Sequence, residues 1–266
     1  MWRVVRIALV VCLGVVLLAM IFEDQLIFAP SKFPEGNWRP SGLNQEDARF
    51  QSADHTKLHG WYIAHKNPRA FVVFCHGNAG NITHREHILR SLRDVVGVSV
   101  LIFDYRGYGR SEGKPNEAGI LADARAARRW LAKRAGVVEK QIVLMGESLG
   151  GAVAVDLAAD GGARGLILES TFTSLPDVAA YHYPWLPVRW FLHTKLNAAQ
   201  SIKRYHGPLL QTHGDRDRIV PYQIGRRLFE AANGPKQFIT IPGGDHNDLR
   251  DRAYYEKVRA FVEGLP

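Results

Sequence analysis

Short apolar runs of strand length alternate with longer helix-forming segments along most of this chain. From residue 70 onward six of these runs are almost continuously apolar, which indicates strands buried on both faces, at 70–75, 98–103, 142–145, 166–168, 209–212 and 238–241. The intervening segments predict helices over 82–95, 117–134, 149–159, 222–232 and 251–263. This alternation predicts an α/β fold, a mostly parallel sheet with helices on both faces.

An antiparallel hairpin is expected before this pattern, with strands at 48–52 and 58–64 around the polar turn Asp54-His55-Thr56. The 266 residues are 46% apolar, which is enough for the core of one domain, and we place that domain at 46–266.

The positive charges that give the net charge of +8 are scattered along the chain, without a basic run interleaved with aromatic residues. We therefore predict no nucleic-acid binding and expect a basic face to meet anionic lipid.

The two cysteines are far apart in the predicted organisation. Cys12 lies in the apolar N-terminus, and Cys75 ends a predicted strand. Nothing in their positions brings them together, so we predict no disulfide, no metal site and no cofactor.

The N-terminus has the length and charge pattern of a membrane anchor. Residues 7–22 carry no charge, and with Val4, Val5 and a snorkelling Arg6 the apolar stretch reaches roughly 28 Å of helix, close to the thickness of the hydrocarbon layer. Arginines precede the stretch, whereas Glu23 and Asp24 follow it. The positive-inside rule then places the N-terminus in the cytoplasm and the rest of the chain on the non-cytoplasmic side. The alternative is a cleaved signal peptide, but no Ala-x-Ala-like site follows, so we predict a retained transmembrane helix within residues 1–24.

Two further segments interrupt the α/β pattern. Residues 25–45, rich in proline and aromatic residues, predict an ordered strap between the anchor and the domain. An insertion at about 175–207 predicts a short helical lid. Its aromatic side chains are candidates to line an apolar substrate pocket, although they could equally pack the insertion onto the core: Tyr181, Trp185, Trp190 and Phe191.

A Gly-x-Ser-x-Gly pattern, residues 146–150, falls between a predicted strand and a predicted helix. A serine hydroxyl is a poor nucleophile unless a sharp turn exposes it and a base can reach it. A glycine-flanked turn from strand to helix supplies that exposure, so Ser148 is the candidate nucleophile. The alternative is a strand-to-helix junction of small residues with no chemistry.

A base and an orienting carboxylate are expected at the ends of later strands. His246 follows the last predicted strand within a glycine-containing loop, from which its ring can reach Ser148. Asp217 and Asp215 follow the preceding strand and compete as the acid, with Glu169 a distant third. We assign Asp215 to a turn or helix-cap role. Asp217 is therefore the expected acid.

Two backbone amides are expected to bind an oxyanion. One belongs to Leu149, which follows the candidate nucleophile. The other belongs to the glycine-rich turn after residue 75, most plausibly to Asn78. His76 precedes this turn and is expected to be a structural hydrogen-bonding residue. The glycine-rich loop at 104–113 is expected to shape the rim of the site without taking part in chemistry.

These motifs together resemble the α/β-hydrolase superfamily. The resemblance rests on five segments in order: His76-Gly77-Asn78-Ala79-Gly80, Asp104 to Gly109, Gly146 to Gly150, Gly214-x-x-Asp217 with Val220-Pro221, and Gly244-Asp245-His246. It covers nearly everything from about residue 46 and implies a triad of Ser148, Asp217 and His246. With the anchor and the strap, the chain is similar to single-pass, membrane-bound α/β-hydrolase-domain serine hydrolases.

The expected activity is hydrolysis of carboxylic-ester or thioester bonds, in small-molecule or lipid acyl substrates, through an acyl-enzyme. A serine peptidase or amidase could use the same triad. A non-catalytic membrane scaffold is the alternative from another class. Relatives that use an aspartate nucleophile are disfavoured, because the turn carries serine.

Overall fold

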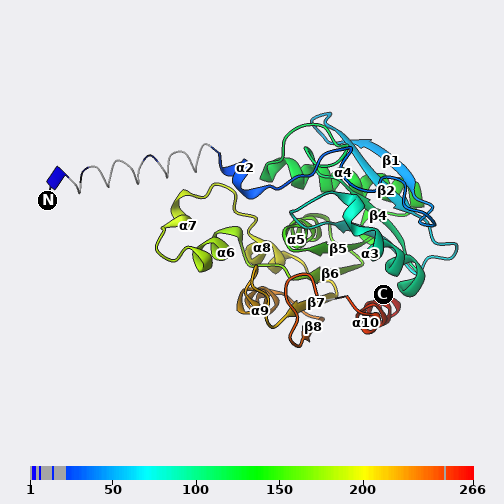
Figure 1. Cartoon of the computed structure of the whole chain (residues 1–266). Helices are drawn as coiled ribbons and strands as arrows, with labels where there is room; N and C mark the ends of the chain where they lie inside the picture. Colours follow the sequence, from blue (N-terminus) through cyan, green and yellow to red (C-terminus); the bar gives the residue numbers. More distant parts are fainter. Residues whose placement is uncertain (1, 4–5, 7–13, 15–21, 249) are drawn as a thin grey trace.

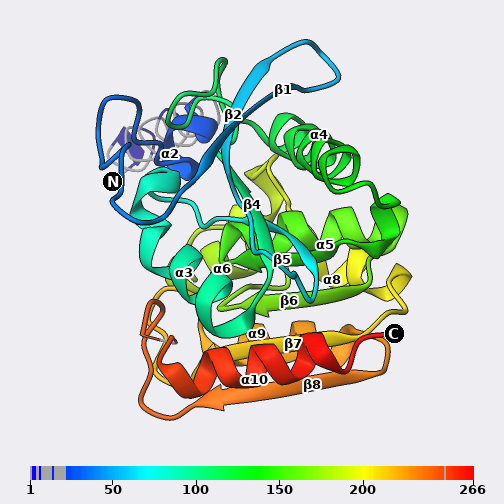
Figure 2. The ribbon, with the colours of Figure 1, turned by 90° about the vertical axis from the view of Figure 1, so that its right-hand side faces the viewer.

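The predicted sheet is present and has eight strands. The computed structural model describes residues 2–3, 6, 14, 22–248 and 250–266. The strands lie in the order β1-β2-β4-β3-β5-β6-β7-β8, and β2 is antiparallel to both of its neighbours, whereas all other pairs are parallel (Figures 1 and 2). Their bounds are β1 Glu46–Gln51, β2 Lys57–Ile63, β3 Phe71–Cys75, β4 Ser99–Phe103, β5 Val143–Glu147, β6 Gly165–Glu169, β7 Leu209–Gly214 and β8 Lys236–Ile241. The predicted hairpin and mostly parallel sheet are confirmed.

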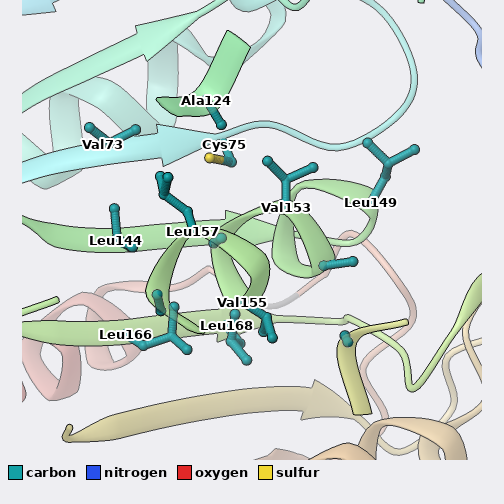
Figure 3. Packing of buried hydrophobic residues seen from close by; sticks show 14 of the residues in the cluster. Val73, Cys75, Ala124, Leu144, Leu149, Val153, Val155, Leu157, Leu166 and Leu168 are labelled. Carbon is teal, nitrogen blue, oxygen red and sulfur yellow. The ribbon is translucent and has the colours of Figure 1, made fainter. Parts of the chain in front are cut away.

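Helices cover both faces of this sheet, as the continuously apolar strands predict. On one face, α4 (Glu117–Ala135), α5 (Leu149–Gly161), α8 (Ala198–Ser201) and α9 (Tyr222–Ala231) pack on one set of strand residues. On the other, α3 (Glu86–Ser91) and α10 (Arg252–Glu263) pack on the alternate set. Figure 3 shows the first interface, where Val153 and Leu157 of α5 meet Val73, Leu144 and Cys75.

The helix predicted over 82–95 is instead divided into three parts. A 3₁₀ turn, η1 (Ile82–Arg85), precedes α3, and a π turn, η2 (Leu92–Val96), follows it. The first break has a local cause: the Asn81 side chain accepts the Thr83 N–H, and the His84 ring accepts the Asn81 N–H. At the other end Gly97 adopts a left-handed conformation and ends the π turn.

The carboxyl ends of the parallel strands meet along one edge of the sheet. Strand β3 pairs with β4 on one side and with β5 on the other, so the chain reverses its direction of progress across the sheet at this point. Open α/β sheets place their ligands outside the carboxyl ends of the strands at such a switch point. The loops that follow β3, β5, β7 and β8 carry the candidate residues and belong to this edge.

The lid, residues 175–207, contains α6 (Leu175–His182), α7 (Val188–Phe191), α8 and the 3₁₀ turn η4 (Ile202–Arg204). Helices α6 and α7 lie beside the short helix α2 (Glu23–Ile27) (Figure 1). Hydrogen bonds join the two parts, since the Glu23 carboxylate accepts the backbone N–H groups of His193 and Thr194. The strap therefore begins against the lid.

Most of the predicted anchor, residues 7–13 and 15–21, lies outside the described residues, and so does Cys12. Among the residues that the structure does describe, no helix combines the length and the apolar character that crossing a membrane requires. Cys75 is a free thiol in the core, and burial raises its pKa to about 12.

Candidate active site

Ser148 lies on a strained turn between β5 and α5. Its φ of 51° and ψ of −119° are unusual for a residue with a side chain, and such a conformation costs about 1–3 kcal/mol. Both flanking glycines are required, because a Cβ on Gly146 would lie 2.2 Å from the Gly150 carbonyl oxygen and one on Gly150 would lie 2.1 Å from that of Cys75. The Ser148 amide donates to the Glu169 carbonyl at 2.8 Å. The turn is thus fixed by close packing and leaves Ser148 partly exposed.

Asp217 and His246 form a hydrogen-bonded pair. The loop after β7 carries Asp217, the loop after β8 carries His246, and Nδ1 of His246 lies 2.7 Å from Oδ2 of Asp217. The other carboxylate oxygen accepts the backbone N–H groups of Ile219 and Val220, at 2.9 and 2.8 Å. With a proton on Nδ1 facing the carboxylate, Nε2 of His246 is left as an acceptor, which is the form that a general base needs.

Several hydrogen bonds stabilise the ionised form of Asp217. Burial by itself would raise the pKa of Asp217, but hydrogen bonds from His213 and His246 outweigh it and hold the pKa well below its ordinary value. Nε2 of the buried His213 lies 3.2 Å from the same oxygen that binds His246. Asp217 therefore remains a carboxylate at neutral pH.

The other two candidate acids have different partners. Asp215 accepts the Gly243 N–H at 2.7 Å and so holds the turn before His246. Glu169 is buried against Arg250. Of the three carboxylates that the sequence leaves in competition, only Asp217 contacts the histidine.

Two adjacent residues after β6 bring the serine and histidine loops together. Ser170 Oγ donates to the His246 carbonyl oxygen at 3.2 Å, and Thr171 Oγ1 donates to the Ser148 carbonyl oxygen at 2.8 Å. Ser148 and His246 are thus held by neighbouring positions of one segment. The loops after β5, β7 and β8 thus place all three predicted triad residues at the carboxyl ends of the parallel strands.

In the turn after β3, the N–H groups of Asn78 and Ala79 have no hydrogen-bond partner among the described residues. In contrast, the Gly77 N–H donates to Glu147 Oε1 at 2.9 Å. The Leu149 N–H belongs to the first turn of α5, where backbone amides have no partner within the helix. His76 is buried, its pKa is lowered by burial to about 4, and its ring binds the Gly77 carbonyl, which is a structural role.

A buried charge network underlies the site and is absent from the sequence-based prediction. Arg250, from the segment between His246 and α10, binds Glu147 and Glu169, and Arg85 binds Glu147 with its Nε at 2.9 Å. Burial alone would raise the pKa of Glu147, but the two arginines and the Gly77 N–H lower it well below its ordinary value. Burial raises the pKa of Glu169. The only sequence signal was a carboxylate placed inside the Gly-x-Ser-x-Gly turn.

Replacing Glu147 with glutamine is expected to lower the free energy of unfolding by about 3 kcal/mol at pH 7, because Arg85 and Arg250 lose a buried counter-charge. The folded-state pKa lies below the ordinary 4.5, so the stabilising effect is complete above pH 4.5 and is lost as the pH falls further. Urea unfolding of the wild-type protein and of Glu147→Gln should give free energies of unfolding whose difference is constant above pH 5 and becomes smaller toward pH 3. Glu256→Gln, at an exposed ion pair, is the control and should change stability by less than about 0.5 kcal/mol. A Glu147→Gln difference that persists unchanged at pH 3 would contradict the assignment.

The four lid aromatics do not share one environment. Tyr181, Trp185 and Trp190 face solvent, with 62%, 74% and 84% of their surface exposed. Phe191 instead lines an apolar groove of about 410 Å³ between α2 and the lid, a volume within the range of small-molecule sites. The groove is also lined by Leu186, Val188 and Leu192 of the predicted lid. Its remaining apolar walls include Leu26 and Ile27 of α2, which the sequence did not indicate.

Comparison with known proteins agrees with the fold and with the resemblance to the α/β-hydrolase superfamily. The family model "Serine aminopeptidase, S33" matches residues 66–198. Protein Rv2307c of Mycobacterium tuberculosis is 39% identical over 97% of this chain and 94% of its own length, and the alpha/beta hydrolase domain-containing protein WAV2 of Arabidopsis thaliana is 33% identical over 90% and 85%. The esterase Pf2001 of Pyrococcus furiosus shares the fold, with a TM-score of 0.71 at 21% identity over 89% of this chain and 99% of its own. The chain therefore belongs to the α/β-hydrolase superfamily, and the enzyme class that these matches support is a hydrolase.

Proposed function

We propose that the protein is a serine hydrolase that cleaves carboxylic-ester or thioester bonds through an acyl-enzyme on Ser148. The observation that carries this proposal is the His246–Asp217 pair, held by residues 170–171 next to a serine in a strained, glycine-flanked turn. Ester hydrolysis needs an activated hydroxyl, a base and oxyanion donors, and each has a residue here.

In the proposed mechanism Ser148 Oγ attacks the acyl carbonyl while His246 Nε2 takes its proton. The oxyanion accepts hydrogen bonds from the backbone N–H groups of Leu149 and Asn78. Collapse of the tetrahedral intermediate breaks the bond to the leaving group, which receives the proton from His246. Water, deprotonated by His246, then attacks the acyl-enzyme and releases the acid and free Ser148. Asp217 orients the ring and stabilises its charged form.

The groove between α2 and the lid favours an acyl group over a peptide. Its walls are mainly apolar, and Ile27 at one side also contacts the Asn78 side chain, beside the proposed oxyanion amide. An aminopeptidase needs a carboxylate to receive the substrate ammonium. Glu23, the carboxylate of this groove, is already bound to the N–H groups of His193 and Thr194. Amide hydrolysis with the same triad is therefore the second candidate, favoured by the description of the matching family model.

We also propose that residues 1–24 are retained as a single-pass anchor, with the catalytic domain on the non-cytoplasmic side. The uncharged run at 7–22 supports this, as do the exposed aromatics Trp185 and Trp190 of the lid, since aromatic side chains favour membrane interfaces. When membranes are extracted with alkaline carbonate and centrifuged, an anchored protein should remain in the membrane pellet. Release into the supernatant would refute the anchor.

A substrate series tests the ester assignment. Turnover of p-nitrophenyl acetate, butyrate, octanoate and dodecanoate should exceed that of aminoacyl p-nitroanilides, and kcat/KM should rise with acyl length. Val188→Trp, which fills the groove, should lower kcat/KM for dodecanoate about tenfold and leave acetate within about twofold, because overpacking costs about 1–3 kcal/mol. The same change at the exposed Val138 is the control and should have no effect. Efficient anilide cleavage with negligible ester turnover would reverse the assignment to the amidase.

A further inference from the structure

The side chain of Asn78 is bound by the segment that follows the predicted anchor. Its Nδ2 donates to the Ile27 carbonyl oxygen at 2.5 Å, and its Oδ1 accepts the Ala29 N–H at 3.3 Å. A carboxamide has the same donor and acceptor as a peptide group, so it pairs with this stretch of main chain much as a neighbouring strand would. The buried Tyr108 hydroxyl donates to the same Oδ1 at 2.9 Å. Asn78 therefore has three partners, two of them from outside the hydrolase domain.

The same segment is joined to the rest of the turn by main-chain hydrogen bonds. The Ser31 N–H donates to the Gly80 carbonyl at 3.0 Å, and the Gly80 N–H donates to the Ala29 carbonyl at 3.2 Å. The buried Asn81 side chain donates to the carbonyls of Ser31 and Glu35, at 3.3 and 2.9 Å. Residues 27–35 thus lie along the turn that contains Asn78, with isolated parallel bridges between Pro30 and Gly80 and between Lys32 and Gly109.

This support matters because the turn has little rigidity of its own. Glycines stand on both sides of Asn78, at 77 and 80, and Gly80 has a φ of 82°. The domain itself fixes the turn near Asn78 through Glu147, which binds the Gly77 N–H, through Arg85, which donates to the Ala79 carbonyl at 2.7 Å, and through Tyr108. An oxyanion donor stabilises the transition state only when it is held in place before the reaction. Without residues 27–35, Asn78 would keep one side-chain contact.

We propose that residues 27–35, the Asn78 side chain and Tyr108 act together as positioning residues that hold the Asn78 N–H toward the oxyanion. This inference rests on the proposed function, which assigns that amide as a donor. Residues 27–35 continue directly from α2, whose Glu23 is bound to the lid. Seating of the membrane-proximal chain therefore sets the lid and the oxyanion turn together, and the N-terminal region does more than tether the domain.

The test uses the full-length protein in detergent with two single variants. Asn78→Asp keeps the size of the side chain but turns the donor that faces the Ile27 carbonyl into an acceptor. Tyr108→Phe removes one hydroxyl. Each should lower kcat for p-nitrophenyl butyrate, about 10- to 100-fold and about 5-fold respectively, with KM within about threefold, since loss of a whole oxyanion donor costs about 10²–10³. Affinity for a boronic acid analogue of the tetrahedral intermediate should fall by the same factors.

Matched controls exist before the amino ends of β7 and β8, at residues that do not line the groove. Asn233 also donates to two main-chain carbonyls, those of Lys203 and Tyr205, and the Tyr205 hydroxyl donates to the Pro208 carbonyl. Asn233→Asp and Tyr205→Phe should leave kcat and boronate affinity unchanged. Melting temperatures identify any variant that fails to fold, and Tyr108→Phe, which leaves every main-chain contact in place, then decides the result.

Two results would overturn the inference. One is wild-type kcat and boronate affinity in folded Asn78→Asp and Tyr108→Phe. The other is a loss of kcat without the parallel loss of boronate affinity, which would assign these side chains a general structural role. Neither result affects the proposed function, which depends separately on the loss of activity in Ser148→Ala.

Discussion

Replacing Ser148 with alanine is expected to lower kcat for p-nitrophenyl butyrate by at least about 10⁴-fold, because the acyl-enzyme can no longer form. The variant should fold, since alanine removes only the Oγ and the turn is fixed by backbone packing at Gly146 and Gly150. Labelling by a fluorophosphonate probe should disappear in parallel. KM should change little, because acyl binding depends on the groove and not on the hydroxyl.

Ser201→Ala, in α8, which does not line the groove, is the control and should retain both turnover and labelling. Full turnover by Ser148→Ala would show that this serine is not the nucleophile. Absence of labelling and of turnover in the wild-type protein would instead support the non-catalytic scaffold. The experiment therefore separates a wrong residue from a wrong class of protein.

Replacing Asp217 with asparagine is expected to lower kcat by about 10⁴-fold while the fold persists. The asparagine amide can donate to Nδ1 of His246, which then keeps its proton on Nε2 and cannot accept one from Ser148. The oxygen that accepts the Ile219 and Val220 amides is retained, so the loop should stay in place. Steady-state kinetics and the rate of fluorophosphonate labelling measure the effect.

Asp215→Asn is the matched control for this second prediction. Its side-chain oxygen can still accept the Gly243 N–H, so kcat should fall by less than about fivefold. Equal losses in the two variants would contradict a special role for Asp217. A large loss only in Asp215→Asn would transfer the orienting role to that residue.

Local sequence signals predicted the parts of the site that depend on short-range geometry. The Gly146, Ser148 and Gly150 spacing predicts a tight strand-to-helix turn because only glycine allows the backbone contacts found there. The apolar runs predict a buried parallel sheet, and the order of the motifs along the strands predicts that Asp217 and His246 meet. The prediction of one continuous helix over 82–95 was wrong. Hydrogen bonds at Asn81 and His84 stabilise a 3₁₀ turn at its start, which helical periodicity does not reveal.

Other features depend on contacts between distant positions and have no local pattern. Arg250 meets Glu147 across 103 residues, and Asn78 meets Ile27 across 51. The aromatic residues of the lid predicted a pocket, but three of the four face solvent and the groove takes much of its wall from α2. The residue type shows that a side chain can be buried against apolar neighbours. Only the tertiary structure shows which neighbours it contacts.

The sequence by itself therefore determined the class of fold, the strand-to-helix turn at Ser148 and the loops that carry the proposed partners Asp217 and His246. Periodicity, glycine spacing and turn chemistry act over a few residues, and they are legible in the order of the amino acids. The tertiary structure alone decided that the strap binds the turn after β3, that a buried charge network lies beside the Gly-x-Ser-x-Gly turn and that α2 completes the groove. Such contacts depend on which surfaces the sheet brings together, and loop closure over 50 to 100 residues leaves no periodic trace in the sequence.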